Sequence, residues 1–453
     1  MIKRRGRTTR PGSFGARRIF GMAVLALVGC EPEPGAGVTA LTGATVVDVV
    51  TGRLVPDAVI LIRDRHVVAV GAADAVAVPR GSDVTDLRGR WIVPGLIDAH
   101  THLQPWGLKV ALRYGVTAVR DLHDGDPLAD TLRAMALRLP GPHFFAAVAM
   151  VDAPPTTYPD AMPVSTPDSA DAVVGRLASR GALWIKVYTR ITPEVLEAVV
   201  DAARVRRLPV AAHLGLTDAI TAARLGVTSI EHLSGIPEAA GDSTALFAAH
   251  AQGFFAGWTA FERSWSTLDT IALTGVVREL AAQRVDLVPT LVLHETFSSL
   301  NDPAVFRLAD LKEVPDTARR NWDVPGMIKR AGWTEADFQA FRAARPMQDF
   351  ALRTFVASGG RVVAGTDASN QLLVPGASLH TEMELLVHAG LTPLDALRAA
   401  TMRAADLLGA DSLGRLRPGT AADLVVLSAD PLADIRNTRR IERVMLGGEW
   451  VKR

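Results

Sequence analysis

The sequence predicts an α/β fold in which a (β/α)8 TIM-like barrel stands beside a small β-sandwich domain. Between residues 91 and 410, eight short apolar runs alternate with stretches of helical period, which is typical of buried parallel strands separated by helices. β-branched runs flank this region, and we assign residues 39–90 and 411–453 to one composite domain. The length of 453 residues fits a barrel with one additional unit.

The composition excludes several classes of protein. Hydrophobic residues make up 48% of the chain and charged residues 21%, unlike a collagen-like, disordered or disulfide-stapled protein. With 49 basic and 48 acidic residues, the chain has no overall charge that would indicate a nucleic-acid partner.

Residues 1–29 have the composition of an export signal. They hold seven basic and no acidic residues, and removing them leaves 42 basic and 48 acidic residues, a net charge of −6. The apolar run Ile19–Gly29 has eleven residues, whereas a membrane span needs about 20. Arg17-Arg18 also resembles part of a twin-arginine signal, so the export route stays open.

Cys30, the only cysteine, ends this run in Leu27-Val28-Gly29-Cys30, a pattern that resembles a bacterial lipobox. The resemblance implies a lipoprotein signal peptide over residues 1–29, a lipidated Cys30 as the first mature residue, and a polar tether over residues 30–38. We therefore expect an exported protein that a lipid anchors at the periplasmic or extracytoplasmic face of a bacterial membrane. The alternative is an apolar cysteine buried in an N-terminal helix.

Strands and helices follow from the local pattern in chain order. In the composite domain, strands are expected over residues 41–50, 58–70, 423–427 and 443–446. The eight barrel strands are expected over residues 92–99, 116–119, 144–151, 183–188, 210–213, 229–232, 287–293 and 362–365. Helices between them are expected over residues 128–139, 170–179, 193–206, 218–225 and 268–283.

Polar side chains that are costly to bury stand at the C-terminal ends of these strands. Such ends surround one pocket in a barrel, and a metal site requires this convergence of imidazoles, an anionic oxygen and an open position for water. A single histidine there would be interpreted as a hydrogen-bonded core residue, but six such residues favour a metal site. They are His100, His102, Lys186, His213, His232 and Asp367.

Three motifs resemble the signatures of the amidohydrolase superfamily: PGLIDAHTH at residues 94–102, Glu231-His232, and Gly365-Thr366-Asp367. The resemblance covers residues 39–453. Its nearest branch is the imidazolonepropionase-related hydrolases, which include Xaa-Pro dipeptidases. It implies two divalent metal ions, with zinc as the expected ion.

The resemblance also assigns the ligands. One metal would be bound by His100, His102 and Asp367, the other by His213 and His232, and a carboxylated Lys186 would bridge both. An ammonium between two dications would be repelled and desolvated, which lowers its pKa, and the neutral amine can add CO2 to form a carbamate. The alternative is a lysine that pairs with a carboxylate inside the barrel.

The implied reaction is hydrolysis of a C–N bond by a metal-activated hydroxide. Asp367 would accept a proton and deliver it to the leaving nitrogen. The expected substrate is a small molecule with an amide or peptide bond, cleaved by a dipeptidase of the Xaa-Pro type or an N-acyl amino acid amidase. Alternatives are a cyclic amide, lactone or phosphotriester hydrolase, a deaminase on the same metals, or a non-catalytic binding lipoprotein.

Candidate substrate residues are Tyr188, His123, Arg120 and His294, which follow strands on the same face. Tyr188 would bind a substrate carboxylate or a developing oxyanion, although an aromatic residue that fills the barrel mouth explains it equally well. A surface pair with Asp121 explains Arg120 equally well, and His123 and His294 would each more often be ordinary surface residues. Residues 301–346 would form a helical lid or a solvated insertion. The oligomeric state stays open, and a homo-oligomer is compatible with the sequence.

Overall fold

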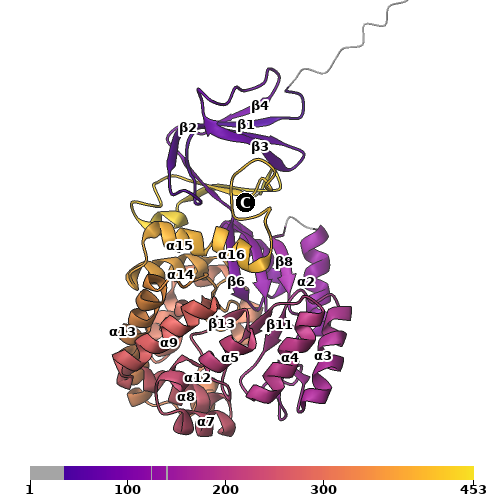
Figure 1. Cartoon of the computed structure of the whole chain (residues 1–453). Helices are drawn as coiled ribbons and strands as arrows, with labels where there is room; N and C mark the ends of the chain where they lie inside the picture. The colour runs from indigo at the N-terminus through magenta and orange to yellow at the C-terminus, as the bar shows by residue number, and fades with distance from the viewer. Residues whose placement is uncertain (1–34, 124, 139–140, 453) are drawn as a thin grey trace, which may run out of the picture.

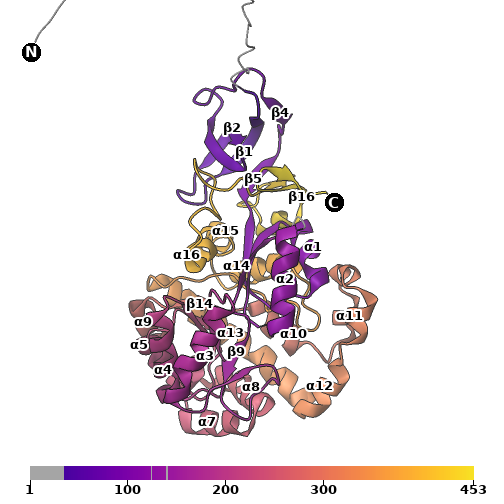
Figure 2. The ribbon, with the colours of Figure 1, turned by 90° about the vertical axis from the view of Figure 1, so that its right-hand side faces the viewer.

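The computed structural model describes residues 35–123, 125–138 and 141–452 of an α/β protein. The expected export signal and Cys30 lie outside the described residues, as does the start of the expected tether. Within the described range, no helix has both the length and the apolar character that a membrane span requires. Figures 1 and 2 show a β-rich unit at one end of the molecule and a helix-rich unit at the other.

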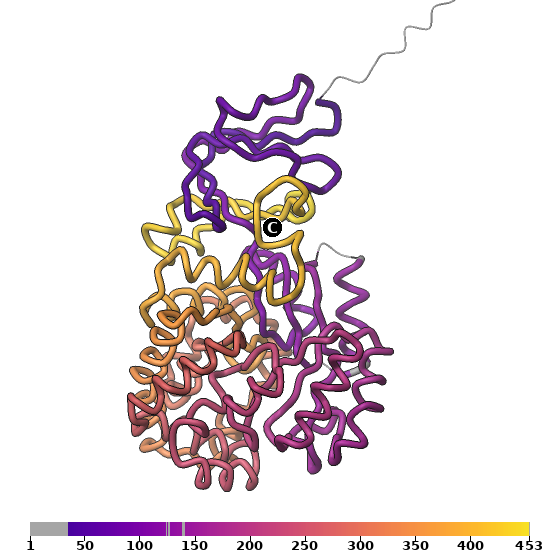
Figure 3. The backbone as a smooth tube through the Cα atoms, in the orientation of Figure 1, coloured from indigo at the N-terminus to yellow at the C-terminus, as the bar shows by residue number. Residues whose placement is uncertain are grey.

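The β-rich unit is built from both ends of the chain. Its hydrogen-bonded order is β17-β16-β15-β5-β1-β2-β3, with β4 paired to β1. In Figure 3 the yellow C-terminal segment runs beside the indigo N-terminal strands. The strands are β1 (Thr39–Val47), β2 (Leu54–Arg63), β3 (His66–Ala72), β4 (Asp83–Asp86), β5 (Trp91–Pro94), β15 (Leu424–Leu427), β16 (Ile441–Leu446) and β17 (Glu449–Trp450).

Hydrogen bonds join these strands into one continuous sheet, and Leu41, Ile60, Leu424 and Met445 share one buried core, so the expected β-sandwich stays a prediction. Strand β1 is irregular, because its register with β2 shifts between Thr42 and Val46. Residues 39–42 pair with β4 and residues 45–46 pair with β5, so one long strand connects both parts of the unit. Strand β5 therefore belongs to this sheet, although its residues were expected in the barrel.

The helix-rich unit holds parallel strands in two ladders, β6-β7-β8 and β10-β9-β11-β12-β13-β14. Single bridges join Thr101 to Ala368 and Leu287 to Val362, so the chain at residues 362–368 lies between β6 and β14. The hydrogen-bonded ladders of the described residues do not form one continuous ring, so closure into an eight-stranded barrel stays a prediction. The strands are β6 (Leu96–Thr101), β7 (Val116–Asp121), β8 (His143–Ala146), β9 (Met150–Asp152), β10 (Met162–Pro163), β11 (Ile185–Val187), β12 (Val210–Ala212), β13 (Ser229–Glu231) and β14 (Asp286–Val288).

The expected strand over residues 362–365 is not formed; Val362 makes only a single bridge, to Leu287. Three other expected barrel strands differ from the prediction for local reasons. The apolar run 92–99 divides between β5 and β6. The run 144–151 breaks at Val148, whose φ of 72° lies in the left-handed region and cannot continue a strand. The seventh strand ends at Val288, and residues 291–298 form a helix instead of extending it.

The five predicted helices are present with small shifts at their ends: α2 (Asp126–Arg138), α3 (Pro167–Ser179), α4 (Pro193–Val205), α5 (Ala219–Leu225) and α9 (Thr270–Gln283). Helix α5 begins after Asp218, whose side chain accepts a hydrogen bond from the Thr221 amide. The other α-helices are α1 (Pro105–Arg113), α6 (Ile236–Ala240), α7 (Ser243–Gln252), α8 (Phe254–Ser264), α10 (Leu291–Ser298), α11 (Asp316–Arg320), α12 (Val324–Ala331), α13 (Glu335–Ala357), α14 (Ala377–His388), α15 (Pro393–Ala399) and α16 (Met402–Leu408). The segment 301–346 is thus largely helical, as expected, and ends within α13.

Candidate metal centre and active site

The predicted metal-site residues lie at or just beyond the C-terminal ends of the parallel strands. Ligand atoms of His100, His232 and Asp367 lie within 4.8 Å of one another, and all three side chains are buried. The His232 ring centroid is 4.6 Å from that of His100 and 4.5 Å from that of His213. His102 and Lys186 line the same cavity as His213, His232 and Asp367. The strands therefore bring all six residues to one place.

Three of the histidines use one ring nitrogen for a hydrogen bond, which leaves the other for a metal. His100 Nδ1 lies 2.6 Å from Glu231 Oε2, and His102 Nδ1 lies 3.1 Å from a main-chain carbonyl oxygen. Because these oxygens only accept, we assign the proton of both rings to Nδ1. His232 Nδ1 lies 2.7 Å from Thr290 Oγ1. In each ring Nε2 is left to present a lone pair, the form that metals bind.

Asp367 supplies the anionic oxygen of the site. Its Oδ1 lies 3.1 Å from His100 Nε2 and 3.0 Å from His102 Nε2. Even so, Oδ1 and His100 Nε2 are both buried without a hydrogen-bond partner among the described residues. A carboxylate oxygen that faces imidazole lone pairs is stabilised by a cation between them, so this donor set fits a divalent metal ion.

Backbone conformation and a glycine place these ligands. The φ angles of His232 and Asp367 are 59° and 64°, in the left-handed region that non-glycine residues adopt only when the surrounding structure imposes it. Gly365 permits close approach of the chain to β6, since a Cβ atom there would lie 2.8 Å from His100 Cβ. The Gly365-Thr366-Asp367 motif thus combines a required close contact with the carboxylate of the candidate metal site.

Lys186 is fully buried in β11, and its Nζ has no hydrogen-bond partner among the described residues. Burial lowers the pKa of Lys186 to about 8, against the opposing effect of the Glu231 and Asp367 charges. A lysine that merely paired with a carboxylate would have that partner within hydrogen-bond distance. The lowered pKa makes the neutral amine more accessible near neutral pH than it is for an ordinary lysine.

Two buried carboxylates hold the site together, and the sequence analysis assigned neither. Asp98 Oδ2 accepts a 2.6 Å hydrogen bond from Thr366 Oγ1, which ties β6 to the segment that carries Asp367. Burial raises the pKa of Asp98 to about 7. Burial also acts to raise the pKa of Glu231, but the Arg120 charge and the hydrogen bond from His100 outweigh it and hold that pKa well below the usual range. The available signal was their position inside the motifs, next to the ligating histidines.

Arg120 does not face the substrate cavity, and the prediction that it binds substrate is wrong. Its side chain is fully buried and donates to Glu231 Oε1 at 2.9 Å and to Ser229 Oγ at 3.0 Å. Its guanidinium carbon lies 4.5 Å from the centroid of the Trp184 ring. These contacts occupy the guanidinium beneath the metal site, where it neutralises Glu231.

A cavity of about 700 Å³ opens at the metal-site residues, and Tyr188 and His123 line it as predicted. The Tyr188 ring stands at a steep angle to that of His213, with centroids 4.8 Å apart. His123 Nε2 lies 3.1 Å from Asp160 Oδ1. Helix α12, within the expected lid, contributes Met327 to the cavity wall.

His294 lies in α10, not in a loop, and it does not line this cavity. It is buried behind Trp258, with ring centroids 5.4 Å apart and nearly parallel planes. Its Nδ1 lies 2.5 Å from Glu262 Oε1. The predicted contact of His294 with substrate is therefore wrong, because the helix that starts at Leu291 turns the side chain into the core.

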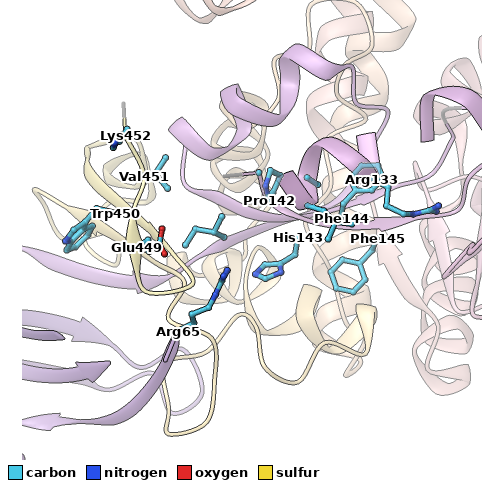
Figure 4. A pocket seen from close by; sticks show the side chains of 14 residues that line it. Arg65, Arg133, Pro142, His143, Phe144, Phe145, Glu449, Trp450, Val451 and Lys452 are labelled. Atoms are coloured by element: carbon cyan, nitrogen blue, oxygen red, sulfur yellow. The ribbon is translucent and has the colours of Figure 1, made fainter. Parts of the chain in front are cut away.

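A second, larger cavity of about 860 Å³ lies between the segment at β8 and the C-terminal strands (Figure 4). Arg65, His143 and Trp450 are among its lining residues, and none of the predicted metal-site residues is. The His143 imidazole there is 2.8 Å from Asp423 Oδ2, a contact between the two units of the fold. We therefore place the candidate active site in the smaller cavity, which the metal-site residues line.

Residues 91–451 match the model of the amidohydrolase family. The chain belongs to the amidohydrolase family. Members of this family are hydrolases that act on C–N bonds, generally with divalent metal bound. The match includes all six residues of the candidate metal site, so the family and the geometry agree on the chemistry.

This amidohydrolase is 27% identical over 396 residues to imidazolonepropionase from Chromobacterium violaceum, which covers 81% of this chain and 84% of the relative. A prolidase candidate from Bifidobacterium longum has a similar fold, with a TM-score of 0.69, 24% identity, and coverage of 93% of this chain and 96% of the other. A Xaa-Pro dipeptidase with methionine in its active site has a TM-score of 0.67 and 20% identity, covering 92% of this chain and 100% of the other. These folds imply a TIM-like barrel with an additional domain.

Proposed function

We propose that this amidohydrolase cleaves the C–N bond of a dipeptide of the Xaa-Pro type or of an N-acyl amino acid. The observation that carries the proposal is a set of buried metal-donor atoms that have no hydrogen-bond partner in the described part of the chain: His100 Nε2, Lys186 Nζ and Asp367 Oδ1. Lys186 and Asp367 line one cavity, and His100 lies beside Asp367. Polar atoms this deeply buried are costly unless they bind a ligand, and together they match a divalent metal. The proposal includes a closed (β/α)8 barrel, in which strand ends converge in this way.

Two metal ions, with zinc as the expected species, would be held by the six residues in the division that the sequence implies. When bound, such ions lower the pKa of water and polarise a substrate carbonyl. Asp367 accepts a proton at its carboxylate from the attacking water and delivers it to the leaving nitrogen. Burial raises the pKa of Tyr188 well above its usual value, so its hydroxyl stays protonated and donates to a substrate oxygen.

Lys186 would join the two metals as a carbamate. The neutral amine attacks CO2, a bond forms between Nζ and the carbon atom, and one proton leaves the nitrogen for solvent. The product would be an anion whose oxygens could hold divalent metal, in place of an ammonium that two dications would repel. The unpartnered and fully buried Nζ supports this assignment.

The fold neighbours support a peptide substrate, since the prolidase candidate and the Xaa-Pro dipeptidase each cover more than 90% of this chain. A second candidate function is hydrolysis of a cyclic amide. It is favoured by the relative named for an imidazolone substrate, which matches over 81% of the chain.

Metal analysis combined with a substrate screen tests the proposal. The protein would be stripped with a chelator, reloaded with zinc, and assayed against dipeptides, N-acyl amino acids and cyclic amides. We expect two metals per chain and zinc-dependent release of an amino acid from at least one linear substrate. Turnover of cyclic amides alone would favour the second function, and a protein that retains no metal would contradict both.

We also propose that the protein is exported and held at a membrane surface by lipid on Cys30. The support is the sequence Leu27-Val28-Gly29-Cys30 and the basic segment before it. The net charge of −6 beyond residue 29 would keep the globular part away from anionic headgroups.

A further inference from the structure

Arg190 lines the same cavity as Lys186 and Tyr188, on the turn that follows β11. Among the described residues, its Nε is buried without a hydrogen-bond partner, and its guanidinium makes a single contact, at 3.5 Å from Nη1 to the Ala251 carbonyl oxygen. No carboxylate of the described residues forms an ion pair with it. A partly buried cation in this state gains most from an anionic ligand.

The other arginine that lines the cavity, Arg330, is paired with a carboxylate and exposed to solvent. Arg330 donates to Asp323 Oδ2 at 2.9 Å, and its side chain is 59% exposed. Among the described residues that line the cavity, Asp367 is the one carboxylate, and it belongs to the candidate metal site. Arg190 is therefore the cavity arginine whose charge is left for a ligand.

The backbone of Arg190 is held in place by a buried carboxylate. Its amide donates to Asp152 Oδ1 at 3.0 Å, and Asp152 also accepts from the amides of Ala153 at 3.0 Å and Thr157 at 2.8 Å. Asp152 is fully buried, so two loops at the cavity share one rigid anchor. A guanidinium on a fixed backbone binds a carboxylate with little loss of entropy.

An aromatic wall stands on another side of the cavity. The Phe254 ring is stacked with that of Tyr188, at 6.2 Å between centroids, and with that of Trp258, at 6.1 Å. Phe255 and Phe297 extend this surface. Such a wall binds an apolar side group by burial of its surface.

We infer that Arg190 binds a free carboxylate of the substrate while the aromatic wall binds an apolar group. The inference rests on the proposed amide hydrolysis and names the residue that recognises the free carboxylate shared by N-acyl and N-aminoacyl amino acids. Arg190 is then a specificity residue, and the neutral amide of the same compound is a poor substrate.

The test compares acid and amide forms of the same probes. Zinc-loaded wild type and Arg190→Met would be assayed with N-acetylphenylalanine and Phe-Pro and with their carboxamides. Loss of a charged hydrogen-bonding pair should lower kcat/KM for the acids about 10–100-fold in Arg190→Met, with a much smaller change for the carboxamides. Arg190→Lys should recover part of the loss, and the matched control Arg330→Met should keep the wild-type preference for acids.

A binding measurement separates this inference from the proposed function. Calorimetry would measure Kd of both probe forms for Asp367→Asn, with and without Arg190→Met, so no turnover is needed. The inference is supported if Asp367→Asn binds the acid more tightly than the carboxamide and this preference disappears when Arg190→Met is added. That result supports the inference even if the wild type hydrolyses no probe, because lack of hydrolysis counts only against the hydrolase proposal. Equal binding and equal turnover of acid and carboxamide by proteins that retain Arg190 would overturn the inference and leave the hydrolase proposal standing.

Discussion

The imidazole of His100 and the carboxylate of Glu231 lie 2.6 Å apart, from Nδ1 to Oε2, although 131 positions separate them in the chain. Both side chains are fully buried. Since the carboxylate only accepts, this contact fixes the proton of His100 on Nδ1 and turns the Nε2 lone pair toward Asp367. Arg120 on the other side of Glu231 balances its charge.

Glu231→Gln should destabilise the protein by about 3–5 kcal/mol, because it leaves the buried Arg120 guanidinium without a counter-charge. Denaturant unfolding measures the loss, and metal analysis should show reduced occupancy, since His100 loses its fixed tautomer. Glu279→Gln is the matched control. Glu279 pairs with Arg224 at 3.2 Å on the surface, and its replacement should cost under about 1 kcal/mol. Equal stability of the two variants would contradict this account.

Lys186→Ala should reduce the metal content from two ions per chain to one and remove nearly all activity, because no other described side chain can take the bridging position. Short-chain carboxylic acids should restore some turnover by placing a carboxylate in the space. Metal analysis and rescue assays check both points, with the exposed Lys109→Ala as control. Two retained metals and an unaltered rate would rule out the bridging role.

Asp367→Asn should lower kcat by about 10²–10⁴-fold, because an amide cannot shuttle a proton to the leaving nitrogen. Circular dichroism should show a preserved fold, since the amide is similar in size to the carboxylate. The exposed Asp411→Asn serves as a control for general effects of charge removal. A rate within a few-fold of wild type would assign proton transfer to another group.

Glu382 gives the stability a defined pH dependence. Burial raises the pKa of Glu382 from 4.5 to about 8, and Oε1 has no hydrogen-bond partner among the described residues. The native state therefore keeps a proton that the unfolded chain releases, so this residue lowers stability as pH rises from about 4.5 to about 8. Each pKa unit corresponds to about 1.4 kcal/mol.

Glu382→Gln should remove that slope and make the protein more stable than wild type at pH 9. Denaturant unfolding at pH 5, 7 and 9 measures it, with the exposed Glu449→Gln as control. If the wild type and Glu382→Gln show parallel pH profiles, Glu382 does not titrate in this range.

Cys30→Ala should abolish lipid attachment and leave the signal peptide uncleaved. Fractionation and intact-mass analysis of the wild type should find a membrane-associated chain that begins at modified Cys30. Recovery of soluble wild-type protein in the cytoplasm with residues 1–29 still attached would show that the N-terminal prediction is wrong.

The grouping of the six candidate ligands was predictable from sequence because their residue types are costly to bury and each lies at the end of a short apolar run. Asp98 and Glu231 were not assigned, since a carboxylate beside a ligating histidine does not reveal whether it binds the metal or orients the ligand. Arg120 and His294 were misassigned for a related reason. Sequence position placed both near strand ends, but the direction of each side chain depended on partners more than 30 positions away.

The sequence by itself determined the α/β class, the family motifs and the six candidate ligands, because hydrophobic period and residue chemistry are local properties. The tertiary structure alone decided that the terminal strands form a single sheet and that residues 291–298 leave the seventh strand for a helix. It also decided which arginine of the cavity has an ion-pair partner, since the sequence around Arg190 and Arg330 does not show which of them pairs with a carboxylate. The physical reason is that pairing and burial depend on distances between residues far apart in the chain, which local pattern does not contain.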